Sequence, residues 1–309
     1  MALKTTLKLT NRSPKQPVKR LPPSIDLPPE ATVEEAKRVV ARAAGIADHN
    51  RVGLFDPATK KTLKDRRARL ADEAGVASAG EVLVKDLGPQ VAWRTVFVVE
   101  YLGPILIHAG AVAARPWLFA GAADAPMSPT QWLSFAMIVG HFVKRELETL
   151  FVHRFSASTM PAFNLVKNSA FYWALSGLLC ACSIYGPRSR AAAARLPALD
   201  ALGAALFLFG EAGNALVHLY LASLRSAGGT ERRIPAGYGF SLVTSPNYMY
   251  EILSWLGVIL VSRDWAVALF IAIGAAQMYV WACGKERAYR KEFGDKYKKK
   301  RYVILPGLL

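Results

Sequence analysis

The sequence predicts an α-helical polytopic membrane bundle of about six transmembrane helices, preceded by a small α+β domain. Hydrophobic residues make up 52% of the 309-residue chain, and nearly all of the long apolar runs lie after Trp93. Several of these runs approach or reach the roughly 20 residues that a helix needs to cross a bilayer. Residues 1–90 are instead polar and mixed in charge. We therefore expect a cytosolic domain at 1–88 and a transmembrane domain at 89–309, with a basic cytosolic C-terminal tail.

Four strands and one helix are expected in the N-terminal domain. The strands are indicated at 3–9, after a turn at 11–17, at 51–55 and at 81–86. Thr32 and Glu35 form a capping box, so a helix is expected to start there and to close at Gly45. This β-β-α-β-β order resembles a ubiquitin-like β-grasp fold. No diglycine ends the domain, so conjugation is not implied.

Six apolar segments follow, and each is expected to form a transmembrane helix. They lie at about 91–119, 130–152, 169–185, 198–224, 246–261 and 265–283. An even number of spans puts both termini on one side of the membrane. The basic loops at 153–167, 225–233 and 285–301 then face the cytosol, as the positive-inside rule requires, whereas the arginines within 186–197 fall on the opposite side. The N-terminus has no apolar segment typical of a cleaved signal peptide.

The net charge of +16 is explained better by a membrane surface or an anionic ligand than by nucleic acid. The basic residues gather at the ends of apolar segments, most densely at 285–301, and no aromatic-interleaved nucleic-acid motif accompanies them. The three cysteines lie in apolar segments without zinc-site spacing, and no metal site is expected. No G-x-G-x-x-G follows a strand, so any dinucleotide has to bind within the helical bundle.

The segment 241–251 is the most promising place for chemistry. Ser245 and Pro246 suit the N-cap and first position of a helix, and Tyr248 and Tyr250 follow directly. The free N–H groups and positive dipole end of such a helix favour an anion, such as a phosphate or a developing enolate. Both phenols would lie beside it.

Two predicted helices carry polar faces that are unusual in a membrane. The second presents His141, Lys144, Arg145 and Glu148, and the fourth presents Glu211, Asn214, His218 and Arg225. An ionisable group near the bilayer centre costs roughly 2.5–3.5 kcal/mol, so these faces, with Glu100 and Glu251, are expected to share one polar cavity. Alternatively, the charges of the second helix extend to the membrane interface. That alternative explains Asn214 and His218 poorly.

Basic residues near the cytosolic end of the bundle suit phosphate-rich ligands; they are Arg225, Arg232, Arg233, Lys285 and Arg287. The simpler interpretation is positive-inside topology with nothing bound. Tyr248 and Tyr289 are phenols beside basic groups. Either could give a proton or a hydrogen bond to an oxyanion, although interfacial tyrosines are often only membrane anchors.

Four segments carry a resemblance to a known family: HFVKRELETLFVHRFS at 141–156, STMPAFNLVKN at 158–168, IPAGYGFSLVTSPNYMYEILSW at 234–255 and KERAYRKEF at 285–293. They resemble the very-long-chain trans-2-enoyl-CoA reductases of the endoplasmic reticulum, members of the steroid 5α-reductase superfamily that carry a ubiquitin-like N-terminal domain. The resemblance implies NADPH-dependent reduction of trans-2-enoyl-CoA, the last step of very-long-chain fatty acid elongation. It also implies membrane lipid and the elongase, ketoacyl reductase and hydroxyacyl dehydratase as partners.

The resemblance also implies residue roles. Lys144, Tyr248 and Glu100 match positions tied to catalysis. Positions tied to the cofactor are Asn214, Arg225, Arg233, Asn247, Glu251 and Tyr289, with His218, Arg232 and Arg287 beside them. Two positions depart from the steroid branch. Phe142 stands where that branch has a tyrosine, which argues against a steroid substrate, and His218 stands where it has an acid, which leaves this cofactor contact open.

Three other functions remain open from the sequence. A steroid or polyprenol enone reductase of the same superfamily would not need the CoA group of the substrate. A methyltransferase on a related bundle would bind S-adenosylmethionine and not NADPH. A non-catalytic scaffold would use the N-terminal domain to recruit elongation enzymes, and would keep its binding partners after loss of Tyr248 and Lys144.

Overall fold

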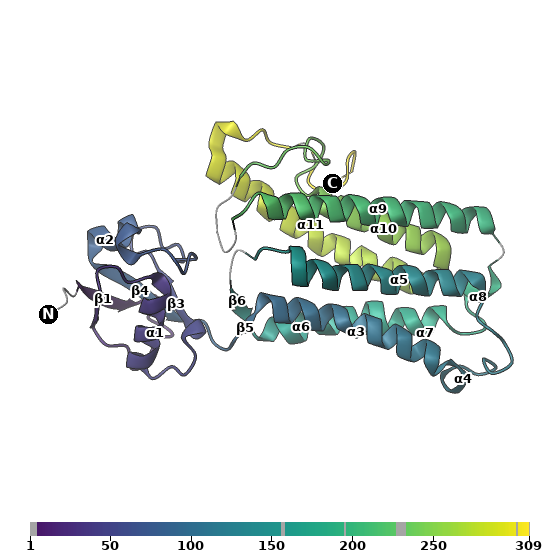
Figure 1. Ribbon diagram of the computed structural model, residues 1–309, viewed down its shortest axis with the longest axis horizontal. Helices are drawn as coiled ribbons and strands as arrows, with labels where there is room; N and C mark the ends of the chain where they lie inside the picture. Colours follow the sequence, from purple (N-terminus) through teal and green to yellow (C-terminus); the bar gives the residue numbers. More distant parts are fainter. Residues whose placement is uncertain (1–4, 156–157, 195, 227–232, 301, 309) are drawn as a thin grey trace. The chain divides into compact units, whose positions relative to one another are not determined.

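The computed structural model describes residues 5–155, 158–194, 196–226, 233–300 and 302–308. The chain folds as two compact units (Figure 1). The first is formed mainly by the residues up to Trp93, together with the segment Phe155–Leu165. The second contains the long helices.

The first unit is built on a four-stranded sheet of order β2-β1-β4-β3. Its elements are β1 (Thr5–Asn11), β2 (Ser24–Leu27), α1 (Val33–Ala44), η1 (His49–Arg51), β3 (Val52–Phe55), η2 (Leu70–Asp72), α2 (Ala74–Ala79) and β4 (Glu81–Asp86). β1 pairs with β2 antiparallel and with β4 parallel, and β3 pairs with β4 antiparallel. A separate two-stranded ladder joins β5 (Gln90–Ala92) to β6 (Thr159–Pro161).

Local sequence signals fix the elements of this unit. Leu7 and Leu9 alternate with exposed residues along β1 and are buried. In α1 the predicted capping box forms: Thr32 N donates to Glu35 Oε2 at 2.8 Å, and Glu35 N donates to Thr32 Oγ1 at 3.2 Å. Gly45 ends the helix with φ +70°, a left-handed conformation that glycine adopts without strain. The predicted β-β-α-β-β order is confirmed and is consistent with a β-grasp domain.

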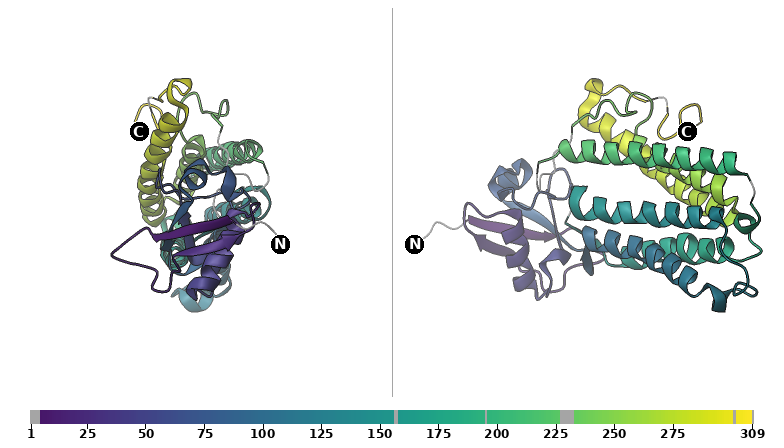
Figure 2. Two further views of the ribbon diagram at one scale, coloured as in Figure 1. Left: turned by 90° about the vertical axis from the view of Figure 1, so that its left-hand side faces the viewer. Right: turned by 45° about the vertical axis from the view of Figure 1, so that its right-hand side comes forward.

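Among the described residues, the second unit has a long helical segment at each of the six predicted places (Figure 1). Its helices are α3 (Trp93–Ala113), α4 (Arg115–Leu118), α5 (Pro129–Leu147), α6 (Phe163–Phe171), α7 (Cys180–Ile184), α8 (Arg190–Ala193), α9 (Pro197–Ser223), α10 (Pro246–Ser262) and α11 (Trp265–Phe293). Two π-helical stretches, η3 (Glu148–Val152) and η4 (Tyr172–Leu179), extend α5 and join α6 to α7. A short 3-10 turn, η5 (Gly294–Lys296), follows α11, which runs obliquely to α9 (Figure 2).

Three boundaries differ from the sequence prediction. The first helix ends at Ala113 rather than near residue 119, because the chain breaks before α4. The third segment begins earlier, at Phe163. The last helix continues to Phe293, because the basic residues after Cys283 are themselves good helix formers.

The chain is a membrane protein by the length and composition of its helices. Three helical stretches within the described residues are long and apolar enough to span a bilayer: Trp93–Ala113, Pro197–Ser223 and Trp265–Lys296. Helix α10 has 17 residues, α5 ends in a charged turn, and the third segment is divided by η4. The number of six transmembrane spans therefore stays a prediction.

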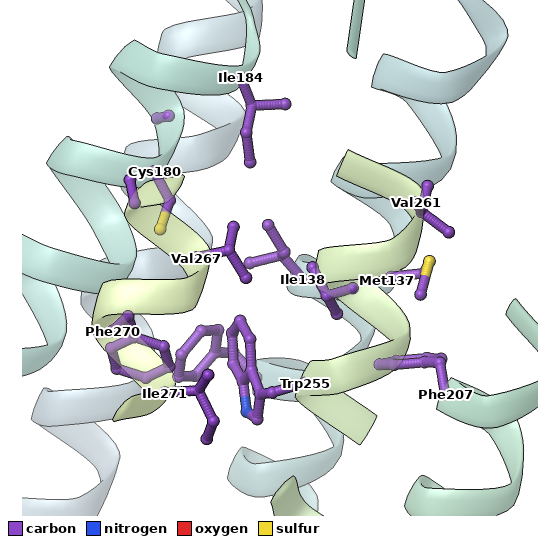
Figure 3. Packing of buried hydrophobic residues seen from close by; sticks show 14 of the residues in the cluster. Met137, Ile138, Cys180, Ile184, Phe207, Trp255, Val261, Val267, Phe270 and Ile271 are labelled. Carbon is purple, nitrogen blue, oxygen red and sulfur yellow. The ribbon is translucent and has the colours of Figure 1, made fainter. Parts of the chain in front are cut away.

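The core of the second unit is an apolar cluster between its helices (Figure 3). Trp255 on α10 is 1% exposed and packs edge-on against Phe270 of α11, with ring centroids 4.7 Å apart. Ile138 of α5 is completely buried in the same cluster. Trp255 also packs against His141, at 5.0 Å between ring centroids, so the apolar core adjoins the polar residues described below.

Glycines bring α9 and α10 into direct backbone contact. A Cβ atom at Gly257 would lie 2.5 Å from the carbonyl oxygen of Gly203 and 2.7 Å from the backbone nitrogen of Phe207. A Cβ at Gly210 would lie 2.4 Å from Ser254 Oγ and 2.6 Å from its backbone nitrogen. Small residues permit this kind of close helix packing in membranes. The contact sets which residues of α9 face which residues of α10.

We expect Gly257→Ala to separate α9 from α10, because the added methyl group meets backbone atoms that cannot move aside. Overpacking of this kind costs roughly 1–3 kcal/mol. The measurement is the midpoint of thermal unfolding in detergent. Gly140→Ala on α5 is the matched control, since its Cβ meets no atom within 4 Å. Equal midpoints for the two variants would contradict the close contact.

A second prediction concerns Lys37 in the first unit, which is 7% exposed. Burial, together with the nearby charge of Arg66, lowers the pKa of Lys37 to about 8. The unfolded chain therefore binds more protons than the folded chain above that pH, and stability rises as the pH rises from about 8 toward the ordinary lysine pKa. Urea titrations of the full chain, followed by amide resonances of β4, should show this rise. The variant Lys37→Met should lose it, and a rise that persists in the variant would assign it to another group.

Candidate active site

The polar faces of α5, α9 and α10 meet inside the second unit and form one connected set of contacts. We call this set the polar network. It contains His141, Lys144, Arg145, Glu148, Glu211, Asn214, His218 and Glu251. The prediction that these residues lie together is confirmed, and direct hydrogen bonds and ion pairs connect them across the helices. The predicted polar cavity between them stays a prediction. The alternative, in which the charged side chains of α5 only extend to the membrane interface, does not account for these contacts between helices.

His141 lies between two carboxylates. Its Nδ1 atom is 2.8 Å from Glu211 Oε1, and its Nε2 atom is 3.3 Å from Glu251 Oε1. A neutral imidazole has one N–H group, so only the protonated ring can donate to both acids. We conclude that His141 contributes a positive charge that holds α5 between α9 and α10.

Lys144 lies one helical turn after His141 and connects the same helices. Its Nζ atom is 2.9 Å from Glu211 Oε2 and 3.4 Å from Glu148 Oε1, and it donates to Asn214 Oδ1 at 2.5 Å. The ammonium group thereby has one hydrogen-bond acceptor and two carboxylate oxygens as ion-pair partners, and those two oxygens have no hydrogen bond among the described residues. Lys144 is fixed in position, as a residue that acts on a substrate needs to be.

Asn214 links α9 to the start of α10. Its amide nitrogen donates to the backbone carbonyl of Asn247 at 2.9 Å and to Glu251 Oε2 at 3.0 Å. Asn214 is 1% exposed, so both donors and the oxygen facing Lys144 are satisfied within the protein. Of the residues predicted to contact the cofactor, the structure brings Asn214, Asn247 and Glu251 together.

Arg145 forms the other end of the polar network. Its Nη1 atom donates to Glu148 Oε2 at 2.6 Å and lies 3.2 Å from His218 Nδ1, while its Nη2 atom donates to the hydroxyl of Tyr101 at 3.0 Å. Glu148 Oε2 is also 3.0 Å from His218 Nδ1. Glu148 opens the π-helical stretch η3, and such irregular turns are frequent at functional sites.

Glu148, His153 and His218 have the donor atoms of a metal site, because these atoms all lie within 4.8 Å of one another. The sequence spacing did not reveal this group. The guanidinium of Arg145, however, already contacts the carboxylate of Glu148 and the Nδ1 atom of His218. Its permanent positive charge opposes a cation at the same atoms. We therefore assign no metal to the group.

The three predicted catalytic residues have different surroundings. Lys144 belongs to the polar network. Glu100 on α3 is 1% exposed and interacts with Asn168 and Tyr101, and one of its oxygens has no hydrogen-bond partner within the part of the chain that is described. Tyr248 on α10 faces α11, where Lys285 Nζ lies 4.2 Å from its ring centroid. The described contacts do not connect Tyr248 to Lys144.

The start of α10 differs from the predicted cap. The helix begins at Pro246, but the side chain of Ser245 makes no capping hydrogen bond. Instead, the backbone nitrogen of Ser245 donates to the carbonyl of Val303 at 3.0 Å, because the C-terminal segment lies beside this loop. Buried Glu286 accepts hydrogen bonds from Thr244 and Tyr297, each at 2.6 Å. Sequence reasoning did not predict this role for Glu286, because its partners lie far along the chain or beyond the helix.

The predicted phosphate-binding residues lie outside the polar network. Arg225 follows the end of α9, and its guanidinium donates to the carbonyl of Arg154 at 2.8 Å. This acceptor is neutral, and no carboxylate of the described residues pairs with Arg225. Arg233 and Arg287 are exposed. Tyr289 stacks on Tyr297, with ring centroids 5.3 Å apart. Arg232 lies outside the described residues.

Comparison with known proteins gives matches over almost the whole chain. The family model described as 3-oxo-5-alpha-steroid 4-dehydrogenase matches residues 158–309. A protein of Schizosaccharomyces pombe, provisionally named as an enoyl reductase, is 37% identical over 98% of this chain and 100% of its own length. A very-long-chain enoyl-CoA reductase of Dictyostelium discoideum is 37% identical over 90% of this chain and 92% of its own. A trans-2,3-enoyl-CoA reductase-like protein of Mus musculus is 34% identical over 72% of this chain and 63% of its own.

We expect His141→Phe to destabilise the protein, because the carboxylates of Glu211 and Glu251 then lose the charge between them. Removal of one partner from a buried ion pair costs roughly 3–5 kcal/mol. Thermal unfolding in detergent measures the loss. The double variant His141→Phe with Glu251→Gln should regain part of it, since Lys144 still pairs with Glu211. If His141→Phe unfolds like the wild type, His141 is not the charge that balances these acids.

Proposed function

We propose a reaction for this chain from the premise that it belongs to the very-long-chain enoyl-CoA reductase family. The match to relatives of this family along 90% and more of the chain carries the conclusion. The protein is an oxidoreductase that reduces the double bond of an enoyl-CoA to give the saturated acyl-CoA. This is the final reaction of very-long-chain fatty acid elongation.

The cofactor of this reaction, in our proposal, is NADPH, which supplies the hydride when it is bound. The residues present fit such a group. Asn214 and Glu251 are engaged within the polar network, but their oxygens keep lone pairs that can accept further hydrogen bonds. Arg225 and Arg287 offer guanidinium groups for phosphates. Arg232, Arg233, Asn247 and Tyr289 complete the proposed set. His218 is engaged with Glu148, so we assign it to the positioning of that acid.

The chemistry is proposed to take place at Lys144, Glu100 and Tyr248. Reduction of an enoyl thioester moves negative charge onto the thioester oxygen, and buried donors stabilise that charge strongly. Glu100 offers a buried carboxyl group with an oxygen that is free to contact a ligand. Lys144 places a positive charge between the carboxylates of Glu148 and Glu211 in the polar network. Tyr248 is the proposed acid that protonates the substrate, and the cation Lys285 lies over its ring.

We place the protein in the endoplasmic reticulum membrane, as a multi-pass protein of about six spans with both termini in the cytosol. Three helices with the length and composition of transmembrane helices support the membrane location. The basic segment after residue 285 supports the orientation. The β-grasp-like first unit then faces the cytosol, where the elongase, ketoacyl reductase and hydroxyacyl dehydratase are its proposed partners.

A second candidate is the reduction of a steroid or polyprenol enone. The match of residues 158–309 to the 3-oxo-5-alpha-steroid 4-dehydrogenase family favours it. Phe142 argues against it, because it is completely buried and has no hydroxyl group to polarise a ketone. The two substrates are distinguished by the requirement for CoA: an enone without CoA should support no oxidation of NADPH.

We expect Tyr248→Phe to lower the rate of NADPH oxidation with a long-chain trans-2-enoyl-CoA by about a hundredfold or more, the loss typical of a missing general acid. The assay follows the absorbance of NADPH with purified protein in detergent. Parallel assays with NADH test the preference for the phosphorylated cofactor.

Tyr279→Phe is the matched control, because Tyr279 also lies in the second unit, is 38% exposed and belongs to no proposed site. Its rate should equal that of the wild type. A Tyr248→Phe enzyme as fast as the wild type would remove Tyr248 from the mechanism. If the wild type does not oxidise NADPH with any enoyl-CoA that is tested, the proposed reaction is contradicted and the methyltransferase or the scaffold is favoured.

A further inference from the structure

The second unit contains a buried phenol that the proposed mechanism does not use. Tyr101 follows Glu100 on α3 and is 2% exposed. Its ring packs edge-on against Tyr172, with centroids 5.3 Å apart, and is tilted against the ring of Phe142 at 6.2 Å. A tyrosine in such apolar surroundings needs a partner for its hydroxyl group.

Arg145 supplies that partner. Its Nη2 atom donates to the phenol oxygen of Tyr101 at 3.0 Å, and its Cζ atom lies 5.1 Å from the ring centroid. A guanidinium has donors only, so the phenol oxygen is the acceptor in this bond, and the phenol proton is directed to another acceptor, here the carboxyl group of Glu100. An oxygen of a bound substrate could take the place of that acceptor. The neighbouring cation also strengthens the phenol as a donor, because linked hydrogen bonds polarise one another.

The contact is held in place from the opposite side. The Nη1 atom of Arg145 donates to Glu148 Oε2 at 2.6 Å, and Glu148 is buried at the start of η3. The guanidinium is therefore fixed between a carboxylate and a phenol. A donor fixed in advance costs no reorganisation when charge develops on a substrate, which is the property of an oxyanion-binding group.

Glu100 supplies an independent sign of a ligand at this place. It is 1% exposed and interacts with Tyr101, yet its Oε2 atom has no hydrogen-bond partner within the described ranges. A buried polar atom without a partner is costly and rare in folded proteins. If this atom carries the proton of the carboxyl group, it could donate its O–H to an oxygen of a bound ligand beside Tyr101, which would remove that cost.

We infer that Tyr101 is a catalytic residue, whose hydroxyl group donates a hydrogen bond to the thioester oxygen of the enoyl-CoA. This inference rests on the proposed function. The hydride adds to the β-carbon as the nicotinamide is oxidised, and the electron pair of the double bond moves through the α-carbon toward the thioester oxygen. A proton from the general acid then adds to the α-carbon and restores the carbonyl group. Tyr101 keeps its proton throughout and stabilises the charge on the oxygen.

Tyr248 is less suited to this task. The Nζ atom of Lys285 lies over its ring, 4.2 Å from the centroid, and the contact is to the face of the ring. In Tyr101 the cation contacts the hydroxyl oxygen itself. The two phenols therefore divide the work: Tyr101 binds the developing oxyanion, and Tyr248 stays the proposed source of the proton.

The test compares Tyr101→Phe with the wild type at saturating NADPH and enoyl-CoA. Loss of one oxyanion donor should lower kcat roughly 10²–10³-fold, while the affinity for NADPH, measured by its fluorescence, stays unchanged. Tyr172→Phe is the control, because its half-buried ring lies beside Tyr101 and the described hydrogen bonds of Arg145 do not include its hydroxyl group. It should keep the wild-type kcat.

A spectroscopic measurement separates catalysis from stability. Enoyl-CoA labelled with ¹³C at the thioester carbonyl is bound to the protein without NADPH, and its infrared carbonyl band is recorded. The band should lie lower in the wild type and in Tyr172→Phe than in Tyr101→Phe. If Tyr101→Phe does not fold, fluorotyrosine at position 101 keeps the shape and offers a more acidic hydroxyl, so the band should move further down.

The outcomes distinguish the inference from the function on which it rests. A wild type without enoyl-CoA-dependent oxidation of NADPH overturns the proposed function. An active wild type with an unchanged kcat and an unchanged carbonyl band in Tyr101→Phe overturns the role of Tyr101 alone. A band that does not respond to fluorotyrosine overturns it as well.

Discussion

The backbone contact between α9 and α10 is the constraint on which the rest of the second unit depends. Gly203, Gly210 and Gly257 let the two helices approach until a methyl group would not fit. At that separation the short side chain of Asn214 reaches both the carbonyl of Asn247 and the carboxylate of Glu251. Longer residues at the contact would leave these groups without partners, at the cost that buried polar groups incur.

The polar network becomes tolerable in a membrane because its charges balance. Three acids, Glu148, Glu211 and Glu251, face Lys144, Arg145 and His141, which is protonated between two of them. Each charge has partners on another helix or on the next turn of its own. Buried ions add little net stability when paired, but they define one arrangement of the helices. The network therefore fixes α5 against α9 and α10 as well as forming the site.

Local sequence signals made much of the fold predictable, whereas contacts between residues far apart in the chain could not be predicted. The capping box of Thr32 and the start of α10 at Pro246 depend on neighbouring residues, so the sequence reveals them. Periodicity also placed Lys144 and Asn214 on polar faces. It could not say that the two bond to each other across 70 residues. Tyr101 was missed because a tyrosine in an apolar run resembles any core residue, and only Arg145 on another helix distinguishes it.

The charge balance of the polar network also implies that phosphate groups bind at a different place from the one where the reaction occurs. A network that is already neutral has no excess positive charge for the phosphates of a nucleotide or of CoA. Those phosphates need cations outside it, and Arg225 donates to a neutral carbonyl and keeps its charge available. In our proposal, the uncharged ends of substrate and cofactor enter the bundle beside the buried residues Glu100 and Tyr101, where donors act strongly. The same division explains why the basic residues gather near the helix ends while the phenols and paired acids lie within the helices.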